Sequence, residues 1–468
     1  MATNIIRTVS PSTNQVVCET PETRWDEASS ILRASQEAFV SFSSLSHQAR
    51  KDVVVRALQL FQERKIVLGK ELTLQMGRPI AYSHKEIETM QKRADYLLET
   101  AEEALKSIPG KPENGFQRWV KKVPVGPILI VFAWNFPYLI LVNALIPALL
   151  AGNTVILKPS PQTPLVAQRV CEIFVEAGLP PNVLLIIQSG DSEMVKRLVQ
   201  APEIQGVSFT GSTAGGLAIR EAAAGRTIPL NLELGGNDPA YVRADADLQY
   251  VAAQLVDGAV FNSGQSCCSV ERIYVHSQVH DKFVEELQKD LEQYKLGDPL
   301  DSTTNVGPVI SKAALEAINA QIQDALARGA IDATPENVTF KNPPVEGNYI
   351  APRILINTTH DMAVMREETF GPVIPVYKVS SDDEAIKLMN DTQYGLTASV
   401  WTKDIQRAHE LIDRLESGTV FVNRCDYPNP DLAWTGWKMS GLGCTLGPQA
   451  FNFFVKLKSY HIKETQTS

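Results

Sequence analysis

Two adjacent thiols, Cys267 and Cys268 in GQSCCS, are the side chains of this sequence best suited to covalent chemistry. They lie between a segment predicted as a helix and one predicted as a strand, which places them in a loop. Nearby backbone N–H groups can there lower the pKa of an accessible thiol and make it a nucleophile. An intracellular cysteine is, however, more often an inert small hydrophobic residue. The two side chains alone leave both interpretations open.

A carboxylate and a glycine-rich turn offer further chemistry. The segment LELGGND places Glu233 in an otherwise apolar strand that ends at two glycines. Either a partner charge neutralises this carboxylate, or burial raises its pKa and makes it a general base near neutral pH. The turn FTGSTAGG, residues 209–216, has backbone N–H groups that could hold a phosphate. Glycines also end helices for structural reasons, so this turn alone does not establish a phosphate site.

The elements that must position these residues alternate along the chain. Between about residues 125 and 235, apolar strands and amphipathic helices follow one another, which predicts a doubly wound parallel sheet that binds ligands at the carboxyl ends of its strands. A second alternating α/β unit begins at about residue 237, and residues 26–107 are predicted to be helical. The strand-like segments 117–126 and 453–463 fit neither unit. Strands without a neighbour in sequence often pair across subunits.

Length, composition and charge exclude several classes of protein. The 468 residues call for two or three packed units, and a net charge of −9 without charged blocks argues against a nucleic acid partner. No residue between Lys122 and Lys158 is charged, but Pro124, Pro127 and other breakers divide this run, so we expect a buried core and no membrane span. The N-terminal stretch has no signal-peptide pattern, which predicts the cytoplasm. The six cysteines and seven histidines form neither CxxC nor HExxH, so no metal site is expected.

Eight segments together identify a resemblance. FAWNFP, ILKPS, FTGSTAGG, LELGG, GQSCCSVERI, REETFGPV, QYGLTASV and WKMSGLG stand in the order and rough spacing of the NAD(P)-dependent aldehyde dehydrogenase superfamily. The similarity covers almost the whole chain. It implies an α/β fold with a Rossmann-type cofactor domain, an α/β catalytic domain and a small β oligomerisation extension. The implied boundaries are residues 1–107 and 125–235 for the NAD(P)-binding domain, 236–450 for the catalytic domain, and 108–124 and 451–468 for the oligomerisation strands.

The resemblance also implies catalytic roles. The family motif G-Q-x-C, with an arginine five residues beyond the cysteine, selects Cys267 and Arg272. Glu233 matches the family's base, and Asn135 with the backbone N–H of Cys267 matches the oxyanion hole. The expected reaction is oxidation of an aldehyde to the carboxylic acid with NAD(P)+, through a thiohemiacetal on the cysteine and a thioester that a glutamate-activated water hydrolyses. The alternative is a catalytically silent member that acts as a binding or structural protein, against which these intact residues argue.

Matching positions supply the remaining expectations for cofactor and substrate. Where many NAD-preferring members read K-P-x-E, this chain reads Lys158, Pro159, Ser160 and Pro161, which predicts use of both NAD+ and NADP+ because a carboxylate that would repel a 2′-phosphate is missing. The expected cofactor-binding residues are Trp134, Lys158, Ser160, Phe209, Gly211, Ser212, Leu234, Glu368 and Phe370. The expected aldehyde tunnel consists of Phe136, Leu139, Ile140, Asn143, Ser266, Cys268, Asp426, Pro428 and Trp434.

The identity of the aldehyde does not follow from this tunnel. Asp426 could tolerate a cationic aminoaldehyde or could serve a structural hydrogen bond to the backbone. The paired arginines that grip a substrate carboxylate in succinate-semialdehyde specialists are not evident, although Arg424 lies close by in sequence. The expected partners are a small-molecule aldehyde and further copies of the chain, in a homodimer or homotetramer.

Overall fold

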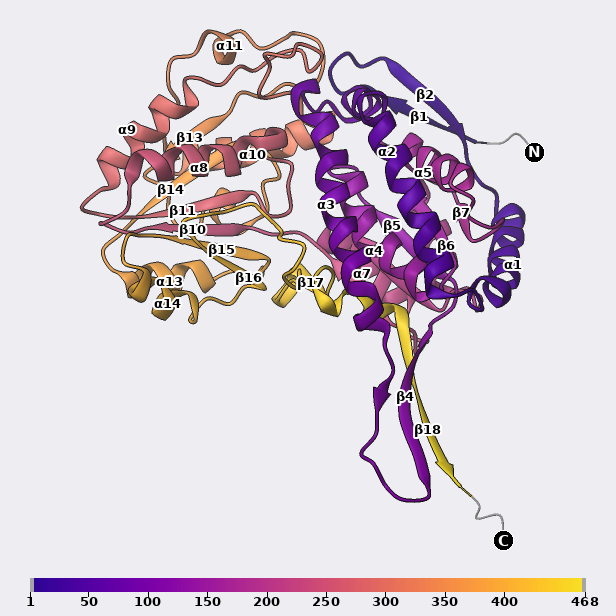
Figure 1. Ribbon diagram of the computed structural model, residues 1–468. Coiled ribbons are helices and arrows are strands. Elements are labelled where there is room, and N and C mark those ends of the chain that lie inside the picture. The colour runs from indigo at the N-terminus through magenta and orange to yellow at the C-terminus, as the bar shows by residue number, and fades with distance from the viewer. Residues whose placement is uncertain (1–3, 465–468) are drawn as a thin grey trace.

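Two largely parallel sheets covered by helices make up most of the molecule, and a narrow three-stranded extension projects from it (Figure 1). The computed structural model describes residues 4–464. The α/β architecture predicted from the alternating pattern is confirmed.

The first sheet has six strands in the order β17-β9-β8-β5-β6-β7, all parallel except β17. Alternate residues of its central strand face opposite layers, because side chains of a strand alternate with a period of two. Ile128, Ile130 and Phe132 pack with the helices on one side of the sheet, whereas Leu129 and Val131 pack with those on the other side. The strands are β5 (Ile128–Phe132), β6 (Val155–Pro159), β7 (Leu184–Ile186), β8 (Gly206–Thr210), β9 (Leu230–Glu233) and β17 (Gly441–Leu442).

The N-terminal segment that was predicted to be helical forms the first three of the helices that cover this sheet. The covering helices are α1 (Trp25–Phe42), α2 (His47–Met76), α3 (Ile80–Leu105), α4 (Pro137–Ala151), α5 (Pro164–Glu176), α6 (Ser192–Gln200) and α7 (Thr213–Ala222). The uncharged run resolves into β5, a loop, α4 and β6, and nearly all of α4 is buried against α2 and α3. Within residues 4–464, no helix is both long enough and apolar enough to cross a membrane.

The second sheet has seven strands in the order β12-β13-β14-β11-β10-β15-β16, with only β12 antiparallel. Its strands are β10 (Asp238–Val242), β11 (Val270–His276), β12 (Ile331–Asp332), β13 (Arg353–Ile356), β14 (Val373–Val379), β15 (Thr397–Trp401) and β16 (Thr419–Val422). Its helices are α8 (Leu248–Val260), α9 (His280–Leu291), α10 (Lys312–Ala327), α11 (Val338–Lys341), α12 (Ala363–Arg366), α13 (Asp382–Asn390) and α14 (Ile405–Ile412). This is the second α/β unit that the sequence predicts.

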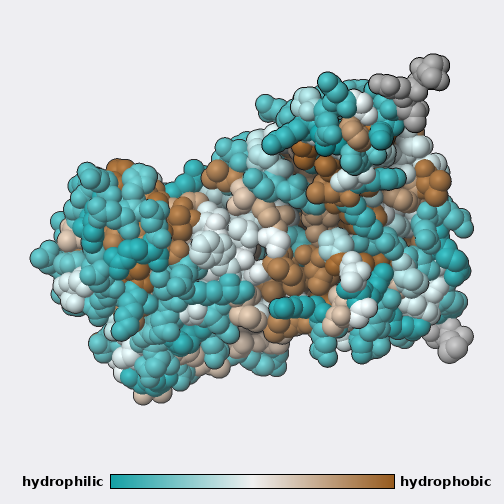
Figure 2. Space-filling model, turned by 90° about the horizontal axis from the view of Figure 1, so that it is seen from below, coloured by the Kyte–Doolittle hydropathy of each residue, from teal (hydrophilic) through white to brown (hydrophobic). Residues whose placement is uncertain are grey.

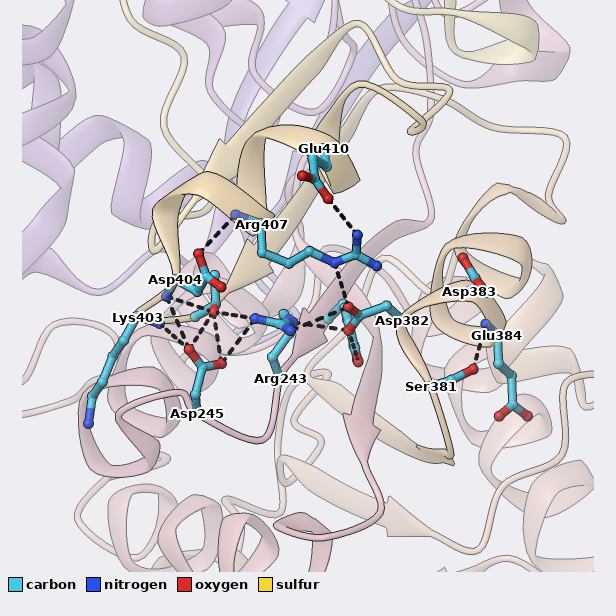
Figure 3. A network of polar contacts seen from close by, with 12 residues as sticks. Arg243, Asp245, Ser381, Asp382, Asp383, Glu384, Lys403, Asp404, Arg407 and Glu410 are labelled. Carbon is cyan, nitrogen blue, oxygen red and sulfur yellow. Dashed lines mark hydrogen bonds and ion pairs between the residues drawn. The ribbon is translucent and has the colours of Figure 1, made fainter.

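An ion-pair network closes the carboxyl edge of the second sheet (Figure 3). Asp382, at the start of α13, accepts hydrogen bonds from Tyr241 (2.8 Å), from Arg243 Nε (3.0 Å) and from Arg407 Nε (2.9 Å). Asp245 accepts from Thr402 and from two backbone N–H groups. The network ties the loops after β10 and β15 to α13 and α14.

The projecting extension is formed by the two segments that fit neither α/β unit. β4 (Phe116–Pro124) pairs antiparallel with β18 (Val455–Lys463) along its whole length, and β3 (Ile108–Pro109) borders β4. The two strands therefore pair with each other inside one chain. The exposed apolar side chains of this extension include Ile108 on β3 and Leu457 and Ile462 on β18. Figure 2 shows further hydrophobic surface on the face seen from below. An N-terminal hairpin, β1 (Ile5–Val9) with β2 (Val16–Pro21), was not predicted.

Candidate active site

A cavity of about 410 Å³ lies between α3, α4, the loop that precedes β11 and the loop that follows β16. It brings together all the residues that the sequence analysis assigns to catalysis and to the tunnel. These are Asn135, Glu233, Cys267, Phe136, Leu139, Ile140, Asn143, Ser266, Cys268, Asp426, Pro428 and Trp434. Residues that the sequence analysis did not single out also line it, among them Arg78, Glu86, Arg93, Thr210 and Asp257.

The loop that carries the two thiols begins with a left-handed turn. After α8, Asn262, Ser263 and Gly264 have φ values of 53°, 59° and 72°. Residues other than glycine rarely adopt such positive φ values. At Gly264, a Cβ atom would also collide with the carbonyl of Gly371. Gln265 then fixes the loop, since its Oε1 accepts from the backbone N–H of Ile310 at 2.7 Å. The turn thus sets the path of the chain into Cys267.

The two cysteines have different surroundings. Cys267 is partly exposed and lines the cavity, whereas Cys268 is only 5% exposed. The Cys268 thiol donates a hydrogen bond to Asp426 Oδ1 at 2.9 Å. A hydrogen bond with Cys267 and burial raise the pKa of Cys268 well above the ordinary thiol value, which disfavours its thiolate. Cys267 is therefore the accessible thiol of the pair.

The carboxyl group of Asp426 bonds to side chains. It accepts from Cys268 and, at 3.4 Å, from the Ser266 hydroxyl. Burial, followed by the proximity of Cys268, raises its pKa well above the ordinary value for aspartate. Within residues 4–464 this carboxyl has side-chain partners and no hydrogen bond to the backbone, so the backbone bond offered as one alternative for Asp426 is not found.

A buried ion pair positions the loop of Asn135. Arg78 pairs with Glu86, donates to the backbone oxygen of Asn135 and to Asn262 Oδ1, and lies over the ring of Phe136. The free oxygen of Glu86 accepts from the first two N–H groups of α4 that follow Pro137, at 2.7 and 3.2 Å. Because Phe136 cannot cap α4, Glu86 supplies the missing acceptor. Sequence reasoning missed this pair, since neither residue belongs to a quoted motif.

Glu233 ends β9 beside the cavity, with both carboxylate oxygens hydrogen-bonded. Thr445 donates to Oε1 and Thr210 donates to Oε2 at 3.4 Å. Burial raises the pKa of Glu233, while the two hydroxyls and the charge of Arg93 oppose this rise. Of the two alternatives for this carboxylate, a raised pKa holds, since no ion pair joins it to a cation within residues 4–464. Such a carboxylate binds a proton more readily than an exposed glutamate does.

The expected cofactor residues lie along the carboxyl edge of the first sheet. Trp134, Lys158, Ser160, Phe209, Gly211, Ser212 and Leu234 fall at or just after the ends of β5, β6, β8 and β9. The Ser212 hydroxyl accepts from the N–H of Gly215 and caps α7, whose first turn is partly exposed.

The surroundings of Lys158 indicate whether this edge of the sheet could bind a nucleotide. Burial lowers the pKa of Lys158 to about 8, and the charge of Glu22 opposes this decrease. Lys158 is only 7% exposed. Within the described part of the chain, its ammonium group has no hydrogen-bond or ion-pair partner. A buried ammonium without a partner favours a ligand with polar or anionic oxygens. The chemistry of this edge therefore fits an adenosine ribose or phosphate.

Glu368 and Phe370 reach the same region from the loop between α12 and β14. Glu368 accepts from the backbone N–H of Gly236 at 2.9 Å, and burial together with the charge of Glu271 raises its pKa. The ring of Phe370 lies edge-to-face with Trp134, at 5.8 Å between centroids. Glu271 holds this loop by accepting from the N–H groups of Thr369 and Phe370.

Two motif residues turn out to brace the scaffold. Arg272, five residues beyond Cys267, is fully buried and donates to backbone oxygens of Asn237 and Met389. Asn237 stands where relatives often have lysine, and its side chain donates to Glu271 and to the backbone oxygen of Glu367.

Arg424 lies outside the cavity, with its guanidinium over the Tyr427 ring. Across residues 4–464, no three His, Cys, Asp or Glu side chains gather as a metal site would require.

Known proteins resemble this chain over nearly its whole length. The model of the aldehyde dehydrogenase family matches residues 1–460. A betaine aldehyde dehydrogenase of Agrobacterium fabrum is 34% identical over 97% of this chain and 91% of that protein. The 4-trimethylaminobutyraldehyde dehydrogenase of Homo sapiens is 31% identical over 96% and 91%. The crystal structure of an NADP-dependent enzyme of E. coli has a TM-score of 0.94 at 29% identity and covers 98% of this chain and 95% of that one.

Proposed function

Because this chain belongs to the aldehyde dehydrogenase family, whose members are NAD(P)-dependent oxidoreductases that convert aldehydes to acids, we propose that Cys267, Asn135 and Glu233 carry out this reaction. The observation that carries the proposal is the cavity in which the accessible thiol, the amide and the carboxylate meet. The silent alternative would leave this arrangement without a use.

The first half of the reaction forms a thioester. The thiolate of Cys267 adds to the aldehyde carbon, and the oxygen becomes an oxyanion that the Asn135 amide and the Cys267 N–H stabilise. The turn at residues 262–264 and the Arg78–Glu86 pair hold these donors in place. When bound, NAD(P)+ supplies the acceptor for the hydrogen and electron pair that leave the aldehyde carbon.

The second half releases the acid. Glu233 takes a proton from a water molecule, which attacks the thioester carbon and displaces the Cys267 thiolate. The Thr445 and Thr210 hydroxyls orient the carboxylate and favour its ionised form. The raised pKa of Glu233 makes it a stronger base than an exposed glutamate.

We further propose how the cofactor is held. Lys158 and Ser160 would contact the adenosine ribose or a 2′-phosphate, and the N-terminus of α7 with Ser212 would face the pyrophosphate. Phe209, Gly211, Leu234 and Trp134 would border the nucleotide, with Glu368 and Phe370 at the nicotinamide end.

Use of both cofactors has a direct test. No carboxylate follows Lys158 at the position where many NAD-preferring relatives have glutamate, so we expect measurable kcat/KM with NAD+ and with NADP+. A preference for NAD+ above roughly a thousandfold, about 4 kcal/mol, would contradict this expectation.

The wider organisation is also a proposal. Residues 1–107 and 125–235 would bind the cofactor, 236–450 would carry the chemistry, and the strands of 108–124 and 451–468 would join subunits in a homodimer or homotetramer. Exposed apolar residues on β3 and β18 support the last assignment.

The experiment for the activity follows NAD(P)H absorbance with aliphatic, aromatic, amino and carboxylated aldehydes. Oxidation of at least one of them, abolished in Cys267→Ala, is the expected result. Cofactor binding without reduction by any aldehyde would favour the silent alternative.

A further inference from the structure

One arginine in the cavity is not used by the reaction described above. Arg93, on α3, is 7% exposed and lines the cavity together with Cys267 and Glu233. Its Nη1 donates to the backbone oxygen of Leu139 at 3.3 Å and to Asn143 Oδ1 at 3.2 Å. Its Nε is buried and has no acceptor within residues 4–464. Buried guanidinium groups are normally paired, because an enclosed charge without a counter-charge is costly.

The carboxylates near Arg93 are engaged elsewhere. Glu86 is bound by Arg78 and by the first turn of α4. Glu233 accepts from Thr445 and Thr210. Among the described residues, none of the ion pairs includes Arg93. Burial lowers the pKa of Arg93, and the nearby charges of Glu233 and Glu86 oppose this decrease. The guanidinium therefore lacks a bonded counter-ion within residues 4–464.

The remaining acids of the cavity do not offset this charge. Burial raises the pKa of Asp426, whose carboxyl already accepts from Cys268. Burial and the nearby Asp290 raise the pKa of Asp257. Both acids are thereby shifted toward their neutral forms, whereas an arginine stays protonated at all ordinary pH values. Arg93 is thus a buried cationic side chain of the cavity that forms no ion pair within the described residues.

We propose, resting on the aldehyde dehydrogenase activity above, that the preferred substrate is a semialdehyde with a carboxylate at its far end, and that Arg93 binds this carboxylate. The substrate carboxylate supplies the counter-ion that Arg93 lacks, at the part of the side chain that lines the cavity. Asn143 and the Leu139 oxygen hold the guanidinium in place from α4. Arg93 is thus a specificity-determining residue of the tunnel, and a cationic aldehyde is disfavoured there.

The test compares aldehydes of equal length and different charge. For the native enzyme, kcat/KM is measured with succinic semialdehyde and its longer homologues, with the unsubstituted aldehydes of the same length, and with the corresponding aminoaldehydes. We expect at least one semialdehyde to exceed its neutral counterpart by about 30-fold or more, the value of one charge-assisted hydrogen bond. In Arg93→Gln this ratio should fall to within about threefold of unity, and Arg93→Lys should retain part of it.

Two controls separate specificity from general damage. Arg424→Gln removes an exposed arginine that does not itself line the cavity, although it stacks on the cavity residue Tyr427, and it should leave the selectivity ratio unchanged. Calorimetric titration with the dicarboxylate product should show binding to native enzyme and to Arg93→Lys but weaker binding, by about tenfold or more, to Arg93→Gln.

The outcomes distinguish this proposal from the one it rests on. Efficient oxidation of neutral or cationic aldehydes without preference for any semialdehyde overturns the role of Arg93 and leaves the activity intact. Oxidation of no aldehyde overturns the activity, and the titration then still decides whether Arg93 binds carboxylates. If Arg93→Gln fails to fold, the native selectivity and Arg93→Lys decide the matter.

Discussion

At the carboxyl edge of the seven-stranded sheet, Asp382 is paired with two arginines, whereas in the tunnel Arg93, Glu233 and Asp426 form no ion pair within residues 4–464, although Arg78 and Glu86 do. Asp382 is held between Arg243 and Arg407 (Figure 3). Burial disfavours its charge, but hydrogen bonds from both arginines and Tyr241 outweigh burial and lower its pKa. In the tunnel, burial dominates and raises the pKa of Glu233 and Asp426.

The difference separates structural charges from functional ones. A carboxylate with two arginine partners gains its stability from them and has little proton affinity left for chemistry. A carboxylate that is enclosed with only hydroxyl partners keeps a high proton affinity, which a general base requires. Substitutions in the network should therefore alter stability with little effect on turnover, and substitutions in the tunnel should do the reverse.

The largest expected effect comes from the adjacent thiols. Cys267→Ala should lower kcat by about four orders of magnitude or more, because it removes the nucleophile, while the unfolding midpoint stays near that of the native chain. Cys268→Ala should lower kcat by less than about tenfold, since this thiol is buried and bonded to Asp426. Steady-state kinetics and urea unfolding check both variants. If Cys268→Ala were the inactive one, the register of the motif would be wrong.

The next effect concerns the pH dependence of thioester hydrolysis. Because Glu233 must be ionised to act as a base, the hydrolysis rate should fall as the pH falls through its raised pKa, above the ordinary glutamate value of about 4.3. Thr445→Val removes a hydrogen bond that favours the carboxylate, so this acidic limb should move to higher pH. Thr210→Val should move it less, since that contact is longer. Single-turnover rates across pH measure these shifts, and an unmoved limb in Thr445→Val would contradict the assignment.

The smallest effect on activity should come from the paired network. Asp382→Asn leaves two arginines without their shared counter-charge and should reduce the free energy of unfolding by about 2 kcal/mol, with kcat changed less than about twofold. Since the pKa of Asp382 is lowered in the folded state, its contribution is complete above the unfolded value near 3.9 and disappears as pH falls through the folded pKa. The exposed neighbour Asp383→Asn is the matched control, with little effect on urea unfolding. A large loss of kcat in Asp382→Asn would erase the distinction between the two regions.

Much of the fold could be predicted from the sequence because local patterns determined it. The uncharged run around Pro137 and Pro147 resolved into strand, loop and buried helix as its breakers indicated. The strands that carry Lys158, Phe209 and Glu233 were recognised from apolar runs followed by turns. The pairing of β4 with β18 could not be predicted, since more than 300 residues separate the two strands. The alternation of apolar and polar residues along a strand does not specify which other strand it pairs with.

The residues of the candidate site likewise fall into those that the sequence predicted and those that it did not. Residues within recurrent motifs, such as Cys267 and Asn135, were found and do converge on one cavity. An amphipathic helix, α3, carries Glu86 and Arg93, and Arg78 lies just before it. The alternation of apolar and charged residues in this helix is typical of a solvent-exposed face, so only tertiary packing shows that these three residues are buried. Thr445 reaches Glu233 because β17 returns to the edge of the first sheet. These contacts depend on which elements meet, which single-sequence patterns do not encode.

The covalent intermediate tests the central claim most directly. In Glu233→Gln the base is lost, so thioester formation should continue while hydrolysis slows by about 10² to 10³-fold. Mass spectrometry of this variant, after mixing with NAD(P)+ and an aldehyde that the native enzyme oxidises, should find the acyl group attached to Cys267. An acyl group on Cys268, or rapid turnover without any acylated protein, would contradict the account.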